Sequence, residues 1–157
     1  MKEVTPLISA AFSIAGDVFN LDEITERLSI QPSTTRTKDE WPKSTVFTFS
    51  DNENESPELL IPRTEWVLKT KRTESYGVSS EIEKLLVLLK NKESIINELC
   101  AEYDLWTTFC AYVHMEGENN PELYLSKDVV RFMAAVNAEF GIDLYVYCDG
   151  SMNCGFD

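Results

Sequence analysis

The sequence has little of what catalysis commonly needs. It has one histidine, His114, and only four cysteines in 157 residues. A Cys–His nucleophile pair requires contact at about 3 Å, yet Cys110 and His114 would lie about 13 Å apart on one strand at ~3.3 Å per residue. No motif marks another cysteine as a partner for the histidine. A half-buried structural histidine is therefore the favoured interpretation.

Signals for metal and phosphate binding are equally weak. Cys148 and Cys154 lie six residues apart without a second pair nearby, whereas zinc ligands are usually closer in sequence. Asp51, Glu53 and Glu55 alternate like the start of a calcium loop, but the glycine and the closing glutamate of such a loop are missing. The six glycines form neither a GxGxxG motif nor a P-loop. We therefore expect no cofactor, no bound metal and no enzymatic activity.

Positive charge is scarce, with 27 acidic against 14 basic residues and a net charge of −13. Nucleic acids and anionic membranes attract clustered Lys and Arg, so we expect neither as a partner. An acidic field attracts basic proteins and accelerates their encounter, although solubility alone would also explain it. Ten of the acids fall in residues 101–157, so the negative field is expected mostly from the C-terminal third.

No targeting or membrane segment is evident. An acid and a proline near the start interrupt the pattern of a signal peptide, and no apolar run reaches the ~20 residues that a membrane span needs. Without a secretory context, the four cysteines are expected to be reduced. We expect a cytoplasmic protein with one domain over residues 1–157.

Apolar periodicity predicts an α+β fold. Both faces of residues 106–115 are fairly apolar, which indicates a central strand. Residues 122–125 should form a short partner strand that pairs with it as a hairpin. Alternation predicts the remaining strands at residues 9–15, 45–50, 66–71 and 142–147.

Capping signals predict about three helices. Asn20 with Glu23, and Ser80 with Glu83, have the spacing of capping boxes. The second helical pattern runs over residues 82–103 and indicates one long helix or a kinked pair. A third helix begins after a Ser126 cap and is expected to end at Gly141.

Together these elements predict a mixed or antiparallel sheet with about three helices packed on it. The strand–helix pairs at the two ends of the chain are also compatible with a ferredoxin-like arrangement. Residues 148–157 are rich in Gly, Asn and Asp and are expected to form a loosely held tail.

A set of residues spread over the chain carries a family resemblance. It consists of residues 12–17, Phe19, 22–25, Leu28, Ile30, Pro32, Ser33, Trp66, Glu74, Ser75, 123–126 and 142–145. This set resembles the bacterial domain of unknown function 4279 family over residues 9–147. The resemblance implies a small α+β domain without assigned enzyme activity, similar to the acidic domains found beside polymorphic toxins. It implies no catalytic residues, and it marks Gly16 as a backbone requirement.

Charge and resemblance together favour an immunity protein that neutralises a cognate toxin domain, as in contact-dependent growth inhibition. A nuclease toxin would present a basic surface to its substrate, and an acidic inhibitor can match that charge. The sequence leaves the oligomeric state open. Charge density predicts a contact surface made of Glu116, Glu118, Glu122, Asp143 and Asp149, with Tyr124 and Tyr147 as aromatic anchors.

Two other functions remain open. A non-catalytic small-molecule or regulatory binding module would use Trp66 or Trp106 to line an apolar pocket with converging polar groups. A carboxylate-based enzyme would place two close carboxylates with separated pKa values in a cleft.

Overall fold

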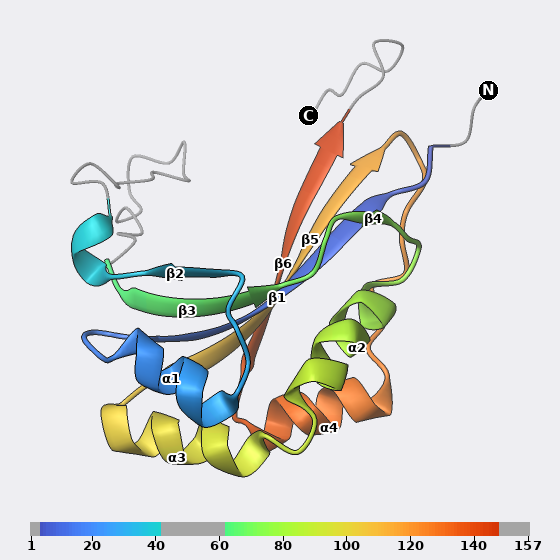
Figure 1. Cartoon of the computed structure of the whole chain (residues 1–157). Helices are drawn as coiled ribbons and strands as arrows, with labels where there is room; N and C mark the ends of the chain where they lie inside the picture. The colour runs from blue at the N-terminus through green and yellow to red at the C-terminus, as the bar shows by residue number, and fades with distance from the viewer. Residues whose placement is uncertain (1–3, 42–61, 148–157) are drawn as a thin grey trace, which may run out of the picture.

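The computed structural model describes residues 4–41 and 62–147. These residues form six strands, four α-helices and one short 3-10 helix (Figure 1). The elements are β1 (Leu7–Gly16), α1 (Leu21–Leu28), β2 (Thr34–Arg36), the 3-10 helix η1 (Lys38–Glu40), β3 (Thr64–Lys69), β4 (Thr73–Glu74), α2 (Val78–Leu89), α3 (Glu93–Tyr103), β5 (Trp106–Glu116), α4 (Lys127–Ala135) and β6 (Glu139–Tyr147).

The described strands form one mixed sheet in the order β2-β3-β1-β5-β6, with β4 also paired to β1. The central strand β1 is antiparallel to β3, β4 and β5, whereas β5 and β6 run parallel. A parallel pair needs a crossover connection, and α4 supplies it between β5 and β6. The expected α+β class with a mixed sheet is confirmed, and β5 lies inside the sheet as predicted.

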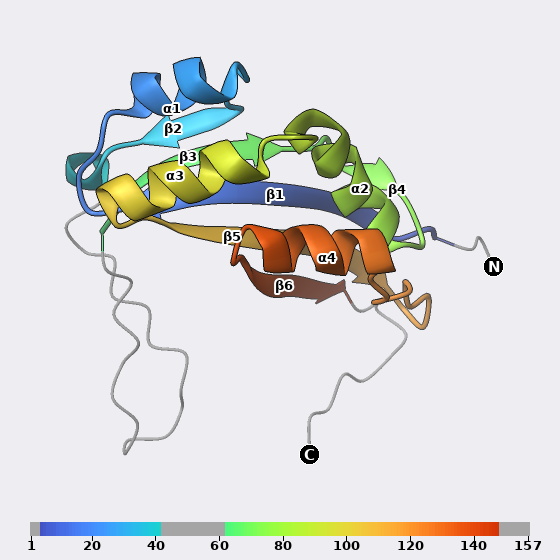
Figure 2. The same ribbon diagram turned by 90° about the horizontal axis from the view of Figure 1, so that it is seen from below.

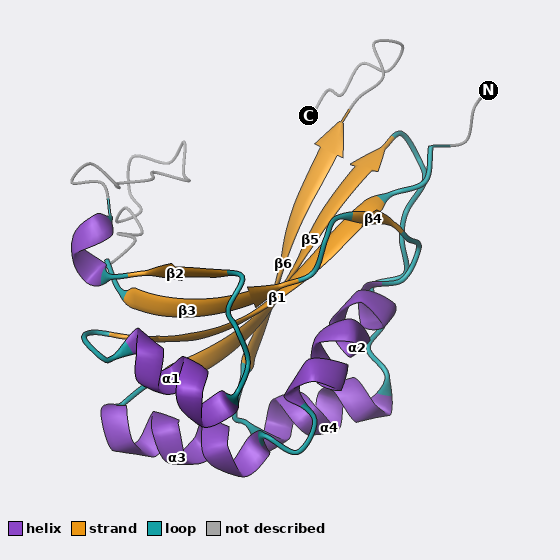
Figure 3. Ribbon diagram, in the orientation of Figure 1, coloured by secondary structure: helices purple, strands orange, loops and turns teal. Residues whose placement is uncertain are grey.

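All four helices lie on one face of the sheet (Figure 2). The core lies between the two layers and is built from alternate residues of the strands, as shown by Phe109, Ala111 and Val113 on β5, which are fully buried. Phe12 of β1 pairs in register with Phe109, and their ring centroids are 4.9 Å apart. The opposite face of the sheet carries no described helix (Figure 3); we call it the open face.

The helix boundaries follow local capping chemistry. The Asn20 side chain accepts hydrogen bonds from the backbone N–H groups of Asp22 and Glu23, so the predicted N-cap of α1 is confirmed. Between α2 and α3 the backbone of Lys90 is extended and Asn91 has φ 62°. This break divides the pattern over residues 82–103 into two helices and makes the helix count four.

The second predicted capping box is wrong. Helix α2 begins at Val78 with Gly77 as its N-cap, three residues before the predicted cap at Ser80. Ser80 lies inside the first turn, where its hydroxyl donates to the Gly77 carbonyl at 2.8 Å. The Ser79 hydroxyl, rather than that of Ser80, bonds to the Glu83 carboxylate.

The predicted hairpin at residues 122–125 is also wrong. Both edges of β5 are occupied, one by β1 and the other by the nine-residue ladder with β6. Glu122 instead forms an isolated parallel bridge with Gly77, and its N–H donates to the Tyr76 carbonyl at 2.6 Å. This segment therefore closes the fold beside the start of α2.

Gly141 does not end a helix, because it lies within β6 opposite Cys110. Helix α4 ends at Ala135, and Asn137, with φ 52°, provides the left-handed residue that the sequence assigned to glycine. Gly16 is likewise explained by packing rather than by a positive φ, since a Cβ there would collide with the Leu105 side chain. The strand predicted at 45–50, the acidic loop with Asp51, Glu53 and Glu55, and the tail at 148–157 lie outside the described residues.

Candidate functional site

The open face carries the polar and aromatic side chains that alternate with the core residues. On β5 these are Cys110, Tyr112 and His114, which are half-buried. The register pairs Tyr112 with Asp143 and His114 with Tyr145, both on β6. One face of a regular sheet therefore collects these residues although the two strands are separated by α4 in the chain.

The side chain of Lys69 extends across the middle of the open face. Lys69 of β3 pairs with Ala11 of β1, and its Nζ lies 4.5 Å from the ring centroid of Tyr112 on β5. The contact thus spans β1, where the open-face residues Ser9 and Ala11 are small and only 2% and 5% exposed. Because the side chains of β1 are small here, side chains from β3 and β5 can contact each other across it.

A stack of three aromatic rings lies at one end of this face. The His114 ring centroid is 4.5 Å from that of Tyr145 and 5.9 Å from that of Tyr147, with interplanar angles of 11° and 10°. The two tyrosines remain 44% and 52% exposed. The stack therefore presents two fixed aromatic side chains to solvent.

The titratable groups of the open face are tuned by burial and by their neighbours. Burial, followed by the charges of Arg72 and Lys69, holds the pKa of His114 below its usual range. Burial is also the main reason that the pKa of Tyr112 rises to about 12 and that the pKa of the Cys110 thiol is raised. The imidazole is therefore neutral near pH 7, and the thiol stays protonated and weakly nucleophilic.

The structure brings four of the seven predicted contact residues to one corner of the sheet. Glu116 pairs in register with Tyr147, and Asp143 lies on the same face of β6. Glu118 follows in the turn after β5, where the Gly117 N–H donates to the Tyr147 carbonyl. We call Glu116, Glu118, Asp143, His114, Tyr145 and Tyr147 the aromatic corner.

The remaining predicted residues do not join this group. Glu122 is held beside Gly77 at the start of α2, and Tyr124 is 61% exposed in the segment that leads to α4. Asp149 lies outside the described residues. Sequence reasoning missed His114 and Tyr145 as members of the corner, although Tyr145 lies two residues from Tyr147 and so shares its face.

A second acidic surface was not anticipated. Helices α1 and α3 lie side by side (Figure 2), and together they carry six carboxylates and one guanidinium. Arg27 pairs with Glu102 at 2.7 Å, Glu23 at 3.3 Å and Glu98 at 3.5 Å. The Tyr103 hydroxyl donates to Glu23, and that hydrogen bond is the main cause that raises its pKa to about 12. The six carboxylates belong to Asp22, Glu23, Glu26, Glu93, Glu98 and Glu102.

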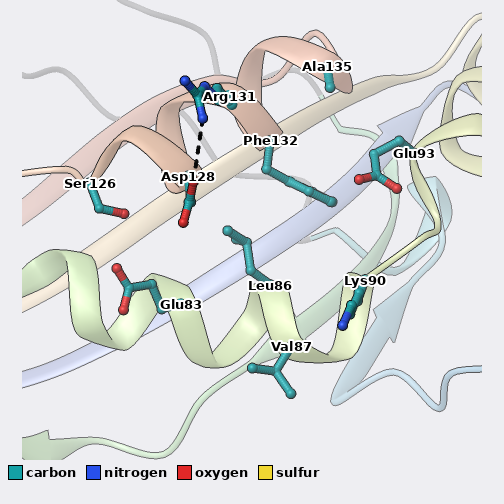
Figure 4. A pocket seen from close by; sticks show the side chains of 10 residues that line it. All are labelled: Glu83, Leu86, Val87, Lys90, Glu93, Ser126, Asp128, Arg131, Phe132 and Ala135. Carbon is teal, nitrogen blue, oxygen red and sulfur yellow. Dashed lines mark ion pairs between the residues drawn. The ribbon is translucent and has the colours of Figure 1, made fainter.

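A groove of about 670 Å³ lies between α2 and α4 (Figure 4). Leu86 and Phe132 point into it from the two helices, and charged residues of both signs surround them. Neither predicted tryptophan lines this groove. Trp66 is fully buried and its indole N–H donates to Thr25 Oγ1 at 3.0 Å, while Trp106 begins β5 and is 46% exposed. The prediction that Trp66 lines an open pocket is therefore wrong.

In residues 4–41 and 62–147, no three His, Cys, Asp or Glu side chains are grouped as a metal site would require. No described helix combines the length and apolar character needed to cross a membrane.

Comparison with known proteins identifies the family but no characterised relative. Neither the curated proteins nor the solved structures include a match to this chain. A family model for a domain of unknown function, DUF4279, matches residues 5–147 and so covers β1 through β6. The chain therefore belongs to the DUF4279 family.

Proposed function

We propose that the protein is a non-catalytic immunity protein that binds and neutralises a cognate toxin domain with a basic surface. The observation that supports this most is the aromatic corner, where two exposed tyrosines are fixed beside carboxylates on a face without a described helix. Tyrosine is enriched in protein–protein interfaces and among the residues that dominate binding energy.

The tyrosines suit this role because they are already ordered. Tyr145 and Tyr147 stack on His114, and the Tyr147 hydroxyl lies 3.0 Å from His114 Nδ1. Little side-chain entropy is lost when such rings enter a partner's pocket, which favours slow dissociation.

The charge distribution would supply fast capture. Besides Glu116 and Asp143 at the corner, the α1–α3 surface holds six carboxylates against one arginine. A basic partner would be steered by this field, and the association rate would fall as salt screens it.

The test begins with the tagged full-length protein in its native host. A tight partner recovered at low salt is identified, purified and recombined, and its toxic activity is measured with and without the immunity protein. We expect stoichiometric inhibition, and an association rate that falls with ionic strength.

The double variant Tyr145→Ala/Tyr147→Ala tests the surface, with Val87→Ala on α2 as the matched control. Val87 is 74% exposed and lies on the helical layer, away from the open face. We expect the double variant to weaken binding at least a hundredfold, equivalent to about 2.7 kcal/mol, mostly through faster dissociation. A reconstituted complex that is insensitive to the double variant, or no inhibition of any recovered partner, would contradict the proposal.

The groove between α2 and α4 supports a second candidate function, a small-molecule or regulatory binding module. Its apolar floor of Leu86 and Phe132, surrounded by charges of both signs, would suit an amphipathic molecule. Binding of an amphipathic probe that is abolished by Leu86→Asp, in a variant shown to fold by circular dichroism, but unaffected by Tyr147→Ala would favour this function over the first.

A further inference from the structure

Strand β6 presents a long edge. Among the described strands it pairs with β5 alone, and the ladder runs without interruption over all nine residues of β6 (Figure 1). Edge strands are commonly protected by charged side chains, especially Lys, by Pro, by bulges or by short length. Strand β6 contains no Lys and no Pro, its two charged residues are Glu139 and Asp143, and the regular register leaves no room for a bulge.

The end of this edge is also apolar. Leu144, Tyr145, Val146 and Tyr147 are consecutive and are each 44% to 55% exposed. Both faces of the strand contribute, since Leu144 and Val146 point to the helical side and the tyrosines to the open face. An exposed edge of this kind is a template for pairing with another strand.

We propose that the occupant of this edge is a second copy of the chain, paired antiparallel through β6 about a two-fold axis at Leu144. The two sheets would join into one, and because the axis is perpendicular to the sheet, both helical layers would lie on the same side. The proposal does not depend on the immunity function.

The residue pattern of β6 is self-complementary about Leu144. On the helical side, Ile142 would face Val146 of the second copy, and the two Leu144 side chains would meet. On the open face, Tyr147 would cover Gly141 of the other copy, an aromatic–glycine pairing that compensates for the missing side chain. β-Branched and apolar cross-strand pairs of this kind stabilise sheets. An unrelated strand would have no reason to match this symmetry.

Charge and strand length select this register over its neighbours. An axis at Asp143 would pair all nine residues but would set the two Asp143 carboxylates against each other, and like charges directly opposite are destabilising. An axis at Ile142 would leave Val146 and Tyr147 unpaired, and an axis at Tyr145 would pair only residues 143–147 of the strand. With the axis at Leu144, Asp143 instead faces Tyr145 of the second copy.

Salt distinguishes this pairing from capture of a basic toxin. Each copy carries a net charge of −13, so two copies repel each other. Screening weakens that repulsion, and dimerisation should strengthen as salt rises. Binding to a basic partner should weaken over the same range.

Sedimentation velocity of the full-length protein tests the dimer, over the micromolar range and at low and high salt. We expect a sedimenting species with twice the monomer mass, and a larger fraction of it at high salt. Leu144→Lys and Val146→Lys should each weaken dimerisation at least tenfold, whereas Val87→Lys, an equally exposed control on α2, should not. Circular dichroism and melting curves establish that the variants fold. A wild-type protein that stays monomeric at high salt, or a folded Leu144→Lys variant that dimerises normally, would overturn the proposal.

Disulfide trapping tests the register. In a background with Cys100 and Cys110 replaced by Ala and the other cysteines by Ser, Leu144→Cys should oxidise readily to a covalent dimer. Directly opposite Cα atoms in an antiparallel pair lie about 4.5–5.5 Å apart, within disulfide range. Ile142→Cys and Val146→Cys should cross-link more slowly, because each faces a residue other than itself. Faster cross-linking at position 142 would refute the axis at Leu144.

Discussion

His114 and Tyr147 lie on adjacent parallel strands with Nδ1 3.0 Å from the phenolic oxygen and their rings within 10° of parallel. The residue in register with His114 is Tyr145, so Tyr147 reaches it diagonally. One imidazole thus orients both tyrosines of the aromatic corner, and its protonation would add a positive charge beneath them.

The titration of His114 should reflect its surroundings. Because burial and the charges of Arg72 and Lys69 lower its pKa, we expect a value below the ordinary 6.5. Replacing Arg72 with Gln should raise this pKa, since a nearby positive charge is removed. The single histidine makes the NMR imidazole titration unambiguous.

The same depressed pKa predicts a loss of stability in acid. The unfolded chain binds the proton more readily than the folded one, so the free energy of unfolding should fall as the pH drops through about 6.5 to the folded pKa. Replacing His114 with Gln should remove this part of the pH dependence. A measured pKa at or above 6.5 in the folded protein would contradict the prediction.

Arg27 should stabilise the protein by neutralising three carboxylates of α1 and α3. The variant Arg27→Gln leaves these carboxylates facing each other, so the melting temperature should fall, and added salt should restore much of the loss. Arg131→Gln is the control, because its ion pair with Asp128 is long, at 3.8 Å, and highly exposed. If both variants melt alike at low salt, the network around Arg27 contributes nothing specific.

Thr25 should contribute more to stability than its position on a surface helix suggests. Its hydroxyl oxygen accepts a hydrogen bond from the indole N–H of the fully buried Trp66. Thr25→Val leaves that donor without its partner and should destabilise the protein by about 1–3 kcal/mol. Thr25→Ser keeps the hydroxyl and should recover much of the loss. Thr34→Val, on the exposed strand β2, should cost less than about 0.5 kcal/mol in urea unfolding.

Asn137 ends α4 with a left-handed backbone at φ 52°. Asn137→Ala should destabilise the protein by about 1 kcal/mol, because a β-carbon without the amide is disfavoured in this conformation. Asn137→Gly should be neutral or stabilising by up to about 1 kcal/mol. Equal effects of the two substitutions, measured by thermal unfolding, would argue against backbone conformation as the cause.

Local patterns predicted the elements that depend on local physics. The apolar character of both faces of β5 correctly indicated a strand inside the sheet, and Asn20 was recognised as the cap of α1. The errors arose where more than one residue type can begin or end a helix. Asn137 rather than Gly141 ends α4, and Gly77 rather than Ser80 begins α2.

The aromatic corner depends on which segment pairs with β5, and no local sequence pattern determines that pairing. Residues 122–125 and 142–147 both had the character of a strand partner for β5, and only the second occupies that edge. That pairing decides whether His114 meets Tyr145 and Tyr147. The acidic surface of α1 and α3 has the same origin, since its carboxylates come from helices about 70 residues apart in sequence.

The central position of β1 has a consequence for folding kinetics. Leu7 pairs with His114, so the strand made first during synthesis acquires its β5 neighbour only after most of the chain has been made. Loop-closure entropy must be overcome before such distant contacts form, and mixed topologies of this kind fold more slowly than helical bundles. Nascent chains should therefore stay susceptible to protease until β5 has left the ribosome.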